Sequence, residues 1–69
     1  MMCIMNRGTV FLHNKWIDNK EMPLVCIVTA TRKGLIYWRQ LENGQEVGGR
    51  YCFNQDEISR FVKEIVEET

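Results

Sequence analysis

The fold is decided by the stretch FNQDEISRFVKEIV, which covers residues 53–66. Apolar side chains recur in it at the spacing that places them on one face of an α-helix. They are Ile58, Phe61, Val62, Ile65 and Val66. This spacing predicts a helix over about residues 55–67, and its apolar face must be covered by the chain that precedes it.

The start of the predicted helix carries its own capping signals. Asn54 can accept a hydrogen bond from the first turn while Glu57 reaches back to the cap, and Phe53 and Ile58 are placed to pack across the helix start. We expect the last turn to fray, because carboxylates gather at the negative end of the helix dipole. They are Glu64, Glu67 and Glu68.

The chain before the helix is rich in β-branched and aromatic residues, which favour strands. The predicted strands cover residues 9–18, 24–31, 35–41, 45–47 and 50–53. Residues 24–31 are almost all apolar or β-branched, which is typical of a central strand. A loop is expected over residues 19–23, since Pro23 cannot donate to a ladder.

Glycines mark the connections between these strands. Arg32-Lys33-Gly34 predicts a three-residue loop, and Asn43-Gly44 predicts a tight hairpin because both residues tolerate positive φ. Gly48-Gly49 interrupts the next strand and indicates a bend or bulge.

These elements predict one α+β domain over residues 1–69, with an antiparallel β-meander and one C-terminal amphipathic helix. The meander either curls into a small, partly open SH3-like barrel or stays an open sheet with the helix packed across it. A core this small gains from a partner subunit, so we expect that a homodimer can form.

Composition points to a globular protein of a reducing compartment. The chain has 69 residues, of which 45% are hydrophobic and 26% charged. Its three cysteines lack the close spacing of disulfide-rich secreted domains, and the apolar start of residues 1–5 is too short for a signal sequence or a membrane span. We therefore expect a cytoplasmic protein that does not enter a membrane.

Charge is balanced overall but divided along the chain. Nine basic residues face nine acidic ones. Residues 1–54 hold seven basic and four acidic side chains, whereas residues 55–69 hold two and five. The sheet is thus expected to be mildly basic and the helix acidic, with no overall field that attracts a polyanion.

The segment CIVTATRKGLIYWR, residues 26–39, resembles small uncharacterised accessory proteins of phages and other mobile elements. The resemblance covers about a fifth of the chain. It contains no catalytic signature and implies no activity that can be transferred.

Catalytic and metal-binding patterns are not indicated. His13 is separated from Cys3 by 10 residues and from Cys26 by 13, and Cys52 lies 26 residues further on, which is unlike the close ligand pairs of structural zinc sites. His13 is the one imidazole that could activate a cysteine, and a structural or surface role is favoured for it. The carboxylates of residues 55–69 are explained by a solvated helix face. We expect no enzyme activity, metal or cofactor.

The hairpin around residues 32–39 is the candidate binding surface, since it joins a basic tip to two aromatic residues. The candidate residues are Arg32, Lys33, Tyr37, Trp38, Arg39 and Arg50, and Lys15, Trp16 and Tyr51 could extend them. Tyr37 and Arg39 share one face of a strand while Trp38 points to the other, so only one set can take part. The sequence predicts a small binding module that acts by protein–protein contact or self-association; the alternative is weak, salt-sensitive nucleic-acid binding.

Overall fold

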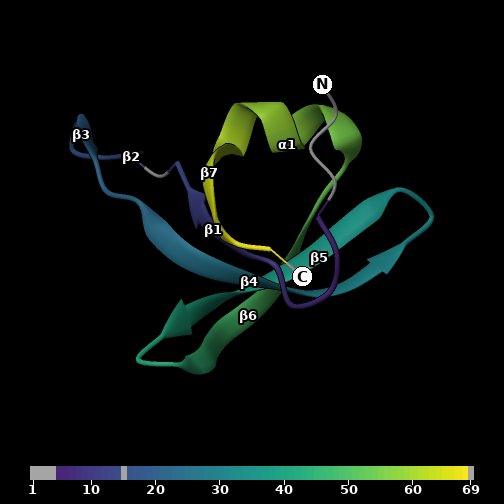
Figure 1. Cartoon of the computed structure of the whole chain (residues 1–69). Coiled ribbons are helices and arrows are strands. Elements are labelled where there is room, and N and C mark those ends of the chain that lie inside the picture. Colours follow the sequence, from purple (N-terminus) through teal and green to yellow (C-terminus); the bar gives the residue numbers. More distant parts are fainter. Residues whose placement is uncertain (1–4, 15, 69) are drawn as a thin grey trace.

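The computed structural model describes residues 5–14 and 16–68, and it shows a mostly β chain with one short helix near its C-terminus (Figure 1). A five-stranded antiparallel sheet has the order β6-β5-β4-β1-β7, and β2 and β3 form a separate two-stranded ribbon. The elements are β1 (Val10–His13), β2 (Trp16–Ile17), β3 (Lys20–Glu21), β4 (Leu24–Arg32), β5 (Leu35–Glu42), β6 (Gln45–Phe53), α1 (Gln55–Phe61) and β7 (Val62–Glu67).

This arrangement confirms the predicted antiparallel meander with a helix near the C-terminus. Strands β4, β5 and β6 follow one another along the chain and pair in that order. Strands β6 and β7 are the two edges of the sheet, so it is open. Of the two arrangements that the sequence left open, the open sheet is therefore the one found.

Two tight turns build the meander. Lys33 and Gly34 have φ values of 49° and 79°, and Asn43 and Gly44 have values of 52° and 78°. Paired positive φ values give the turn twist that matches the right-handed twist of the flanking strands. The Asn43-Gly44 prediction is confirmed. The first loop is one residue shorter than predicted, because Arg32 pairs with Leu35 and belongs to β4.

The predicted strand over residues 9–18 is wrong in its second half. Strand β1 ends at His13, and β2 pairs with β3, which lies where a loop was expected. Asp18 and Asn19 join them with φ values of 51° and 61°. Short polar side chains tolerate this left-handed conformation, so a hairpin forms without glycine.

The last segment of the meander is one strand, and not the two short ones predicted over residues 45–47 and 50–53. Strand β6 runs through Gly48 and Gly49, and its pairing with β5 shifts register between Trp38 and Gln40. Gly48 has a φ of 75°, which is the conformation that lets the extra residues bulge out. The predicted bulge is thus confirmed, but the strand continues past it.

The largest correction concerns the helix, which ends at Phe61 and not near residue 67. Val62 is already extended, with φ −88° and ψ 115°, and β7 pairs antiparallel with β1. In these residues a strand competes with the helix, and the spacing of the apolar residues does not show the factors that favour the strand. Three β-branched residues in six favour a strand, the carboxylates oppose the helix dipole, and β1 offers an unpaired edge.

The predicted helix start is confirmed. The backbone N–H of Glu57 donates to Asn54 Oδ1 at 2.9 Å, and the backbone N–H of Asn54 donates to Glu57 Oε1 at 3.0 Å. These reciprocal bonds form a capping box. Phe53 and Ile58 are buried on either side of the cap, with exposures of 3% and 5%.

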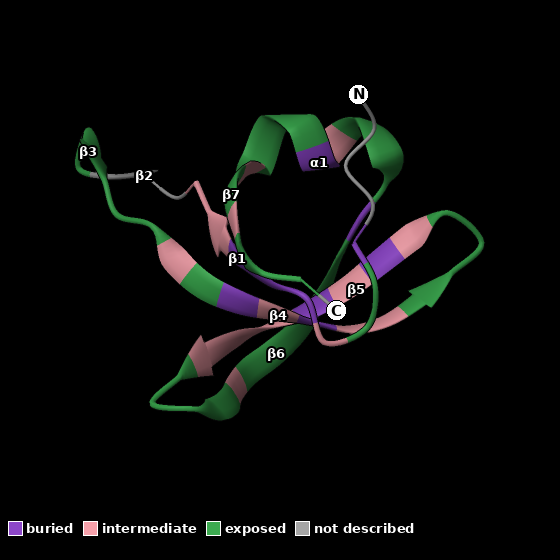
Figure 2. Ribbon diagram, viewed as in Figure 1, coloured by how far each residue is buried: buried purple, intermediate pink, exposed green. Residues whose placement is uncertain are grey.

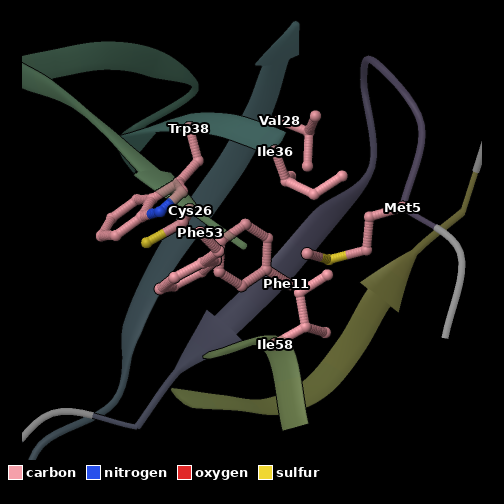
Figure 3. Packing of buried hydrophobic residues seen from close by; sticks show 8 residues of the cluster. All are labelled: Met5, Phe11, Cys26, Val28, Ile36, Trp38, Phe53 and Ile58. Carbon is pink, nitrogen blue, oxygen red and sulfur yellow. The ribbon is translucent and has the colours of Figure 1, made fainter. Parts of the chain in front are cut away.

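The hydrophobic core lies on the face of the sheet that α1 covers (Figures 1 and 3). Its buried members are Met5, Phe11, Cys26, Val28, Ile36, Trp38, Phe53 and Ile58, and Leu24, Val62 and Ile65 pack against it. Of the five residues assigned to the helical face, only Ile58 is fully buried. Met5 was not predicted, since the short apolar start of residues 1–5 shows no strand or helix pattern.

Strands β5 and β6 differ in how far their residues are exposed. Figure 2 shows β6 exposed along most of its length, whereas the first half of β5 alternates between partly buried and buried residues. No helix in the described part of the chain is long and apolar enough to cross a bilayer.

Candidate functional site

The meander has an outer face, which we define as the face of β4, β5 and β6 that points away from the core. Ile36 and Trp38 of β5 are buried on the core side. Because neighbouring residues on a strand point to opposite faces, Tyr37 and Arg39 lie on the outer face. This confirms the alternation predicted for the hairpin.

The strand pairing adds two further arginines to that face. Residues that pair across an antiparallel ladder point to the same side. Arg32 pairs with Leu35, and Tyr37 pairs with Cys52, so Arg32 and Cys52 share the outer face. Arg50 lies two residues before Cys52 on β6 and points the same way. We call Arg32, Tyr37, Arg39 and Arg50 the arginine face.

Arg50 and Tyr37 contact each other directly. The guanidinium carbon of Arg50 lies 4.9 Å from the centre of the Tyr37 ring. This stack joins β5 to the exposed edge strand β6, and it orients a cation beside a half-buried aromatic ring. Arginine and tyrosine are both enriched at protein interfaces.

Arg39 is held in place by two partners of β6. Its Nη2 donates to the carbonyl of Gly48 at 2.8 Å, and its Nη1 lies 3.4 Å from Glu46 Oε1. Part of its charge is therefore neutralised within the chain. Arg32 and Arg50 are exposed and carry most of the positive charge that a partner could meet.

Of the other candidate residues that the structure describes, Trp38 and Tyr51 lie on the core side of the sheet and Lys33 lies in a turn. Trp38 is only 7% exposed and packs in the core. Lys33 sits at the exposed tip of the β4–β5 turn. Tyr51 lies on the core side of β6, since it pairs with Trp38. Lys15 lies outside the described residues, and the side chain of Trp16 is likewise not described.

A continuous set of stacked rings lies on the core side of the sheet. Trp38 stacks on Tyr51 and on Phe53, each with a centroid distance of 5.0 Å. The His13 ring packs against Trp38 at 5.1 Å and stacks on Phe61 at 5.8 Å. His13 therefore packs as a structural ring, which is one of the two roles, structural or surface, that the sequence favoured for it.

Beside these rings is a cleft of about 300 Å³, which we call the aromatic cleft. It is lined by His13, Leu24, Trp38, Gln40 and Tyr51. Tyr51 is 57% exposed and lies at the open rim of this cleft, whereas the buried Trp38 forms its floor. The sequence did not predict it, because its five residues come from four strands whose pairing is needed to bring them together.

Cys26 does not have the setting of a nucleophile. Its thiol is fully buried and donates to the carbonyl of Leu24 at 3.7 Å. Burial raises the pKa of this thiol from 9.0 to about 11, and a backbone hydrogen bond from His13 offsets the shift only in part. The thiol therefore stays protonated at neutral pH. Cys52 is a free thiol exposed on the outer face.

Side chains that could bind a metal ion do not cluster in the described part of the chain. Within residues 5–14 and 16–68 there is no group of three or more histidine, cysteine or acidic side chains placed to hold a metal ion. Cys3 lies outside these residues. The carboxylates Asp56 and Glu57 lie in the first turn of α1, where Glu57 serves the cap.

Comparison of the chain with protein-family models, with curated proteins and with solved structures returned no match.

Proposed function

We propose that this chain is a small non-catalytic binding module whose recognition surface is the arginine face. It holds an acidic segment of another protein or of a second copy of the chain. The observation that carries the proposal is the gathering of three arginines and one tyrosine on one face of the meander. Among the residues that the structure describes, the carboxylate that pairs with this face is Glu46, which contacts Arg39.

A protein partner is favoured over a nucleic acid by the composition of this face. It presents one aromatic ring, Tyr37, and Arg50 already lies over that ring. Single-stranded nucleic acids need several rings on which successive bases stack. A protein segment needs fewer, because a tyrosine and an arginine can anchor an interface whose rim is polar.

Nucleic-acid binding remains the second candidate, and the exposed Arg32 and Arg50 are the observation that favours it. Phosphate contacts of this kind weaken steeply as salt is raised, because each one releases a counterion. We also propose that the module works in the cytoplasm, in line with its free thiols Cys26 and Cys52.

The test is fluorescence anisotropy with a labelled glutamate-rich peptide and with labelled single- and double-stranded DNA, over a range of salt concentrations. We expect the peptide to bind and Arg50→Glu to weaken it by at least about tenfold. Arg60→Glu is the matched control, since Arg60 is an exposed arginine on α1 and its charge changes equally.

Three outcomes decide between the candidates. Peptide binding that is lost in Arg50→Glu and kept in Arg60→Glu supports the protein-binding module. DNA binding that is stronger than peptide binding and collapses with salt supports the second candidate. The arginine-face proposal is wrong if neither ligand binds and the chain sediments as a monomer at every concentration tested.

A further inference from the structure

The aromatic cleft lies on the side of the sheet opposite to the arginine face, and the proposed function does not use it. Trp38 is buried on the core side, Tyr51 pairs with it, and both line the cleft. A ligand there would meet none of Arg32, Tyr37 or Arg50. The two surfaces can therefore be tested separately.

The cleft has the size and the walls of a site for one flat ring. Its volume of about 300 Å³ is at the lower end of small-molecule sites. Three of its five lining side chains are rings, contributed by His13, Trp38 and Tyr51. Flat walls of this kind favour a flat guest, because stacked or edge-on contacts between rings add to simple burial.

The lining also carries polar groups that a ring with a polar edge could use. Gln40 offers both a donor and an acceptor through its side-chain amide. The indole N–H of Trp38, in the floor, has no hydrogen-bond partner in the described part of the chain. A buried donor without a partner is costly. A small shift of Trp38 that lets its indole N–H donate to an acceptor on the ligand would therefore be favourable.

Charged ligands fit less well. The five residues that line the cleft include no carboxylate to pair with a cation and no lysine or arginine to pair with a phosphate. Tyr51 and Phe53 already stack on the Trp38 ring, so its faces do not offer the open surface that cation–π recognition requires. An uncharged ligand is therefore favoured.

From these observations we propose that the aromatic cleft binds an uncharged planar ring whose edge carries amide-like hydrogen-bonding groups, as in a nucleobase or an aromatic carboxamide. The ring lies against Tyr51 and over the edge of Trp38, and its polar edge meets the Gln40 amide. The ring can belong to a free small molecule or to a base within a nucleic-acid strand, and the two sources share this chemistry.

The test is titration of the ¹⁵N-labelled full chain, following the indole N–H signal of Trp38 and the side-chain amide signals of Gln40. The probes are adenine, benzamide and cyclohexanecarboxamide. Benzamide and cyclohexanecarboxamide carry the same amide group on a flat and on a puckered ring. We expect saturable shifts with adenine and benzamide in the millimolar range that one ring can reach, and binding at least about fivefold weaker for cyclohexanecarboxamide.

Two variants and one control variant locate the site. Tyr51→Ala should weaken adenine at least about tenfold, and Tyr51 is exposed enough for the fold to survive the change. Tyr37→Ala is the control, because it removes the same group from the outer face and should leave binding unchanged. Gln40→Leu keeps the volume of the side chain and should weaken both flat probes.

Other results would overturn the proposal. They are the lack of a saturable shift with either flat probe, equal binding of the flat and puckered carboxamides, and unchanged adenine binding by Tyr51→Ala. An oligoadenylate strand then identifies the source of the ring. Binding that equals that of adenine supports a site for a free ring, whereas binding that gains about tenfold or more supports a site for a base within a strand.

Discussion

The guanidinium of Arg50 stacks over the ring of Tyr37 on the outer face of the sheet. Trp38, the next residue after Tyr37, points to the opposite face and stacks on Tyr51. Two adjacent aromatic residues of β5 thus serve different parts of the molecule. Tyr37 belongs to a surface that a partner can reach, and Trp38 belongs to the core. Their substitutions should separate stability from binding.

Trp38→Ala and Tyr37→Ala are expected to differ greatly in stability. Trp38 is 93% buried among four rings, and removing such a side chain costs about 3–5 kcal/mol, which is close to the whole stability of a domain this small. Tyr37→Ala loses one partly exposed stack, worth about 0.5–1 kcal/mol. Urea unfolding followed by circular dichroism measures both. Equal losses would show that the two faces of β5 are not divided as described.

Substitutions in residues 62–67 can test whether this segment is a strand, as in the structure, or a helix. In β7, Ile65 pairs with Phe11 and packs on the core, whereas Val66 is 55% exposed. We expect Ile65→Ala to cost about 1–3 kcal/mol and Val66→Ala to stay within about 0.5 kcal/mol. In a helix both residues would lie on the buried face and both changes would be costly. Unfolding curves of the two variants distinguish these cases, and Cα chemical shifts of residues 62–67 give an independent check.

That segment also shows what the sequence could and could not predict. The turns at Lys33-Gly34 and Asn43-Gly44 and the cap at Asn54 depend on neighbouring residues, so local patterns found them. Whether residues 62–67 continue the helix depends on the unpaired edge of β1, some fifty residues earlier in the chain. Helical spacing cannot report a competitor that distant.

For the candidate sites too, local patterns predicted one part and could not predict the other. Alternation along β5 placed Tyr37 and Arg39 on one face and Trp38 on the other from sequence alone. The contact between Arg50 and Tyr37 depends on the register shift at the β6 bulge, and sequence reasoning does not supply its size. The aromatic cleft was missed for the same reason, because it needs the register of four strands at once.

The capping box should contribute measurably to stability. Asn54→Ala removes the acceptor for the Glu57 N–H and is expected to cost about 1 kcal/mol. Glu57→Ala removes the return bond to the Asn54 N–H. Because the two bonds support one helix start, the double variant should lose less than the sum of the two single losses. Urea unfolding of the four proteins in this cycle gives the coupling. Full additivity would mean that the two bonds act independently.

Stability should fall at alkaline pH because of Cys26. Burial raises the pKa of its thiol to about 11 in the folded chain, from 9.0 for a thiol in water. The unfolded chain therefore releases this proton first. The stabilisation is fully present below about pH 9 and is lost as the pH rises toward about 11, with a slope of up to about 1.4 kcal/mol per pH unit. Urea unfolding at about pH 8 and about pH 10 measures the loss.

Two variants assign that loss to its source. Cys26→Ala removes the titrating group, so its stability should fall less between the two pH values than that of the unaltered chain. Cys52→Ala is the matched control, since Cys52 is an exposed free thiol and its removal should leave the alkaline loss intact. All tyrosines and lysines remain in all three proteins, so any contribution from them cancels in the comparison. An equal alkaline loss in Cys26→Ala would show that the buried thiol is not the group responsible.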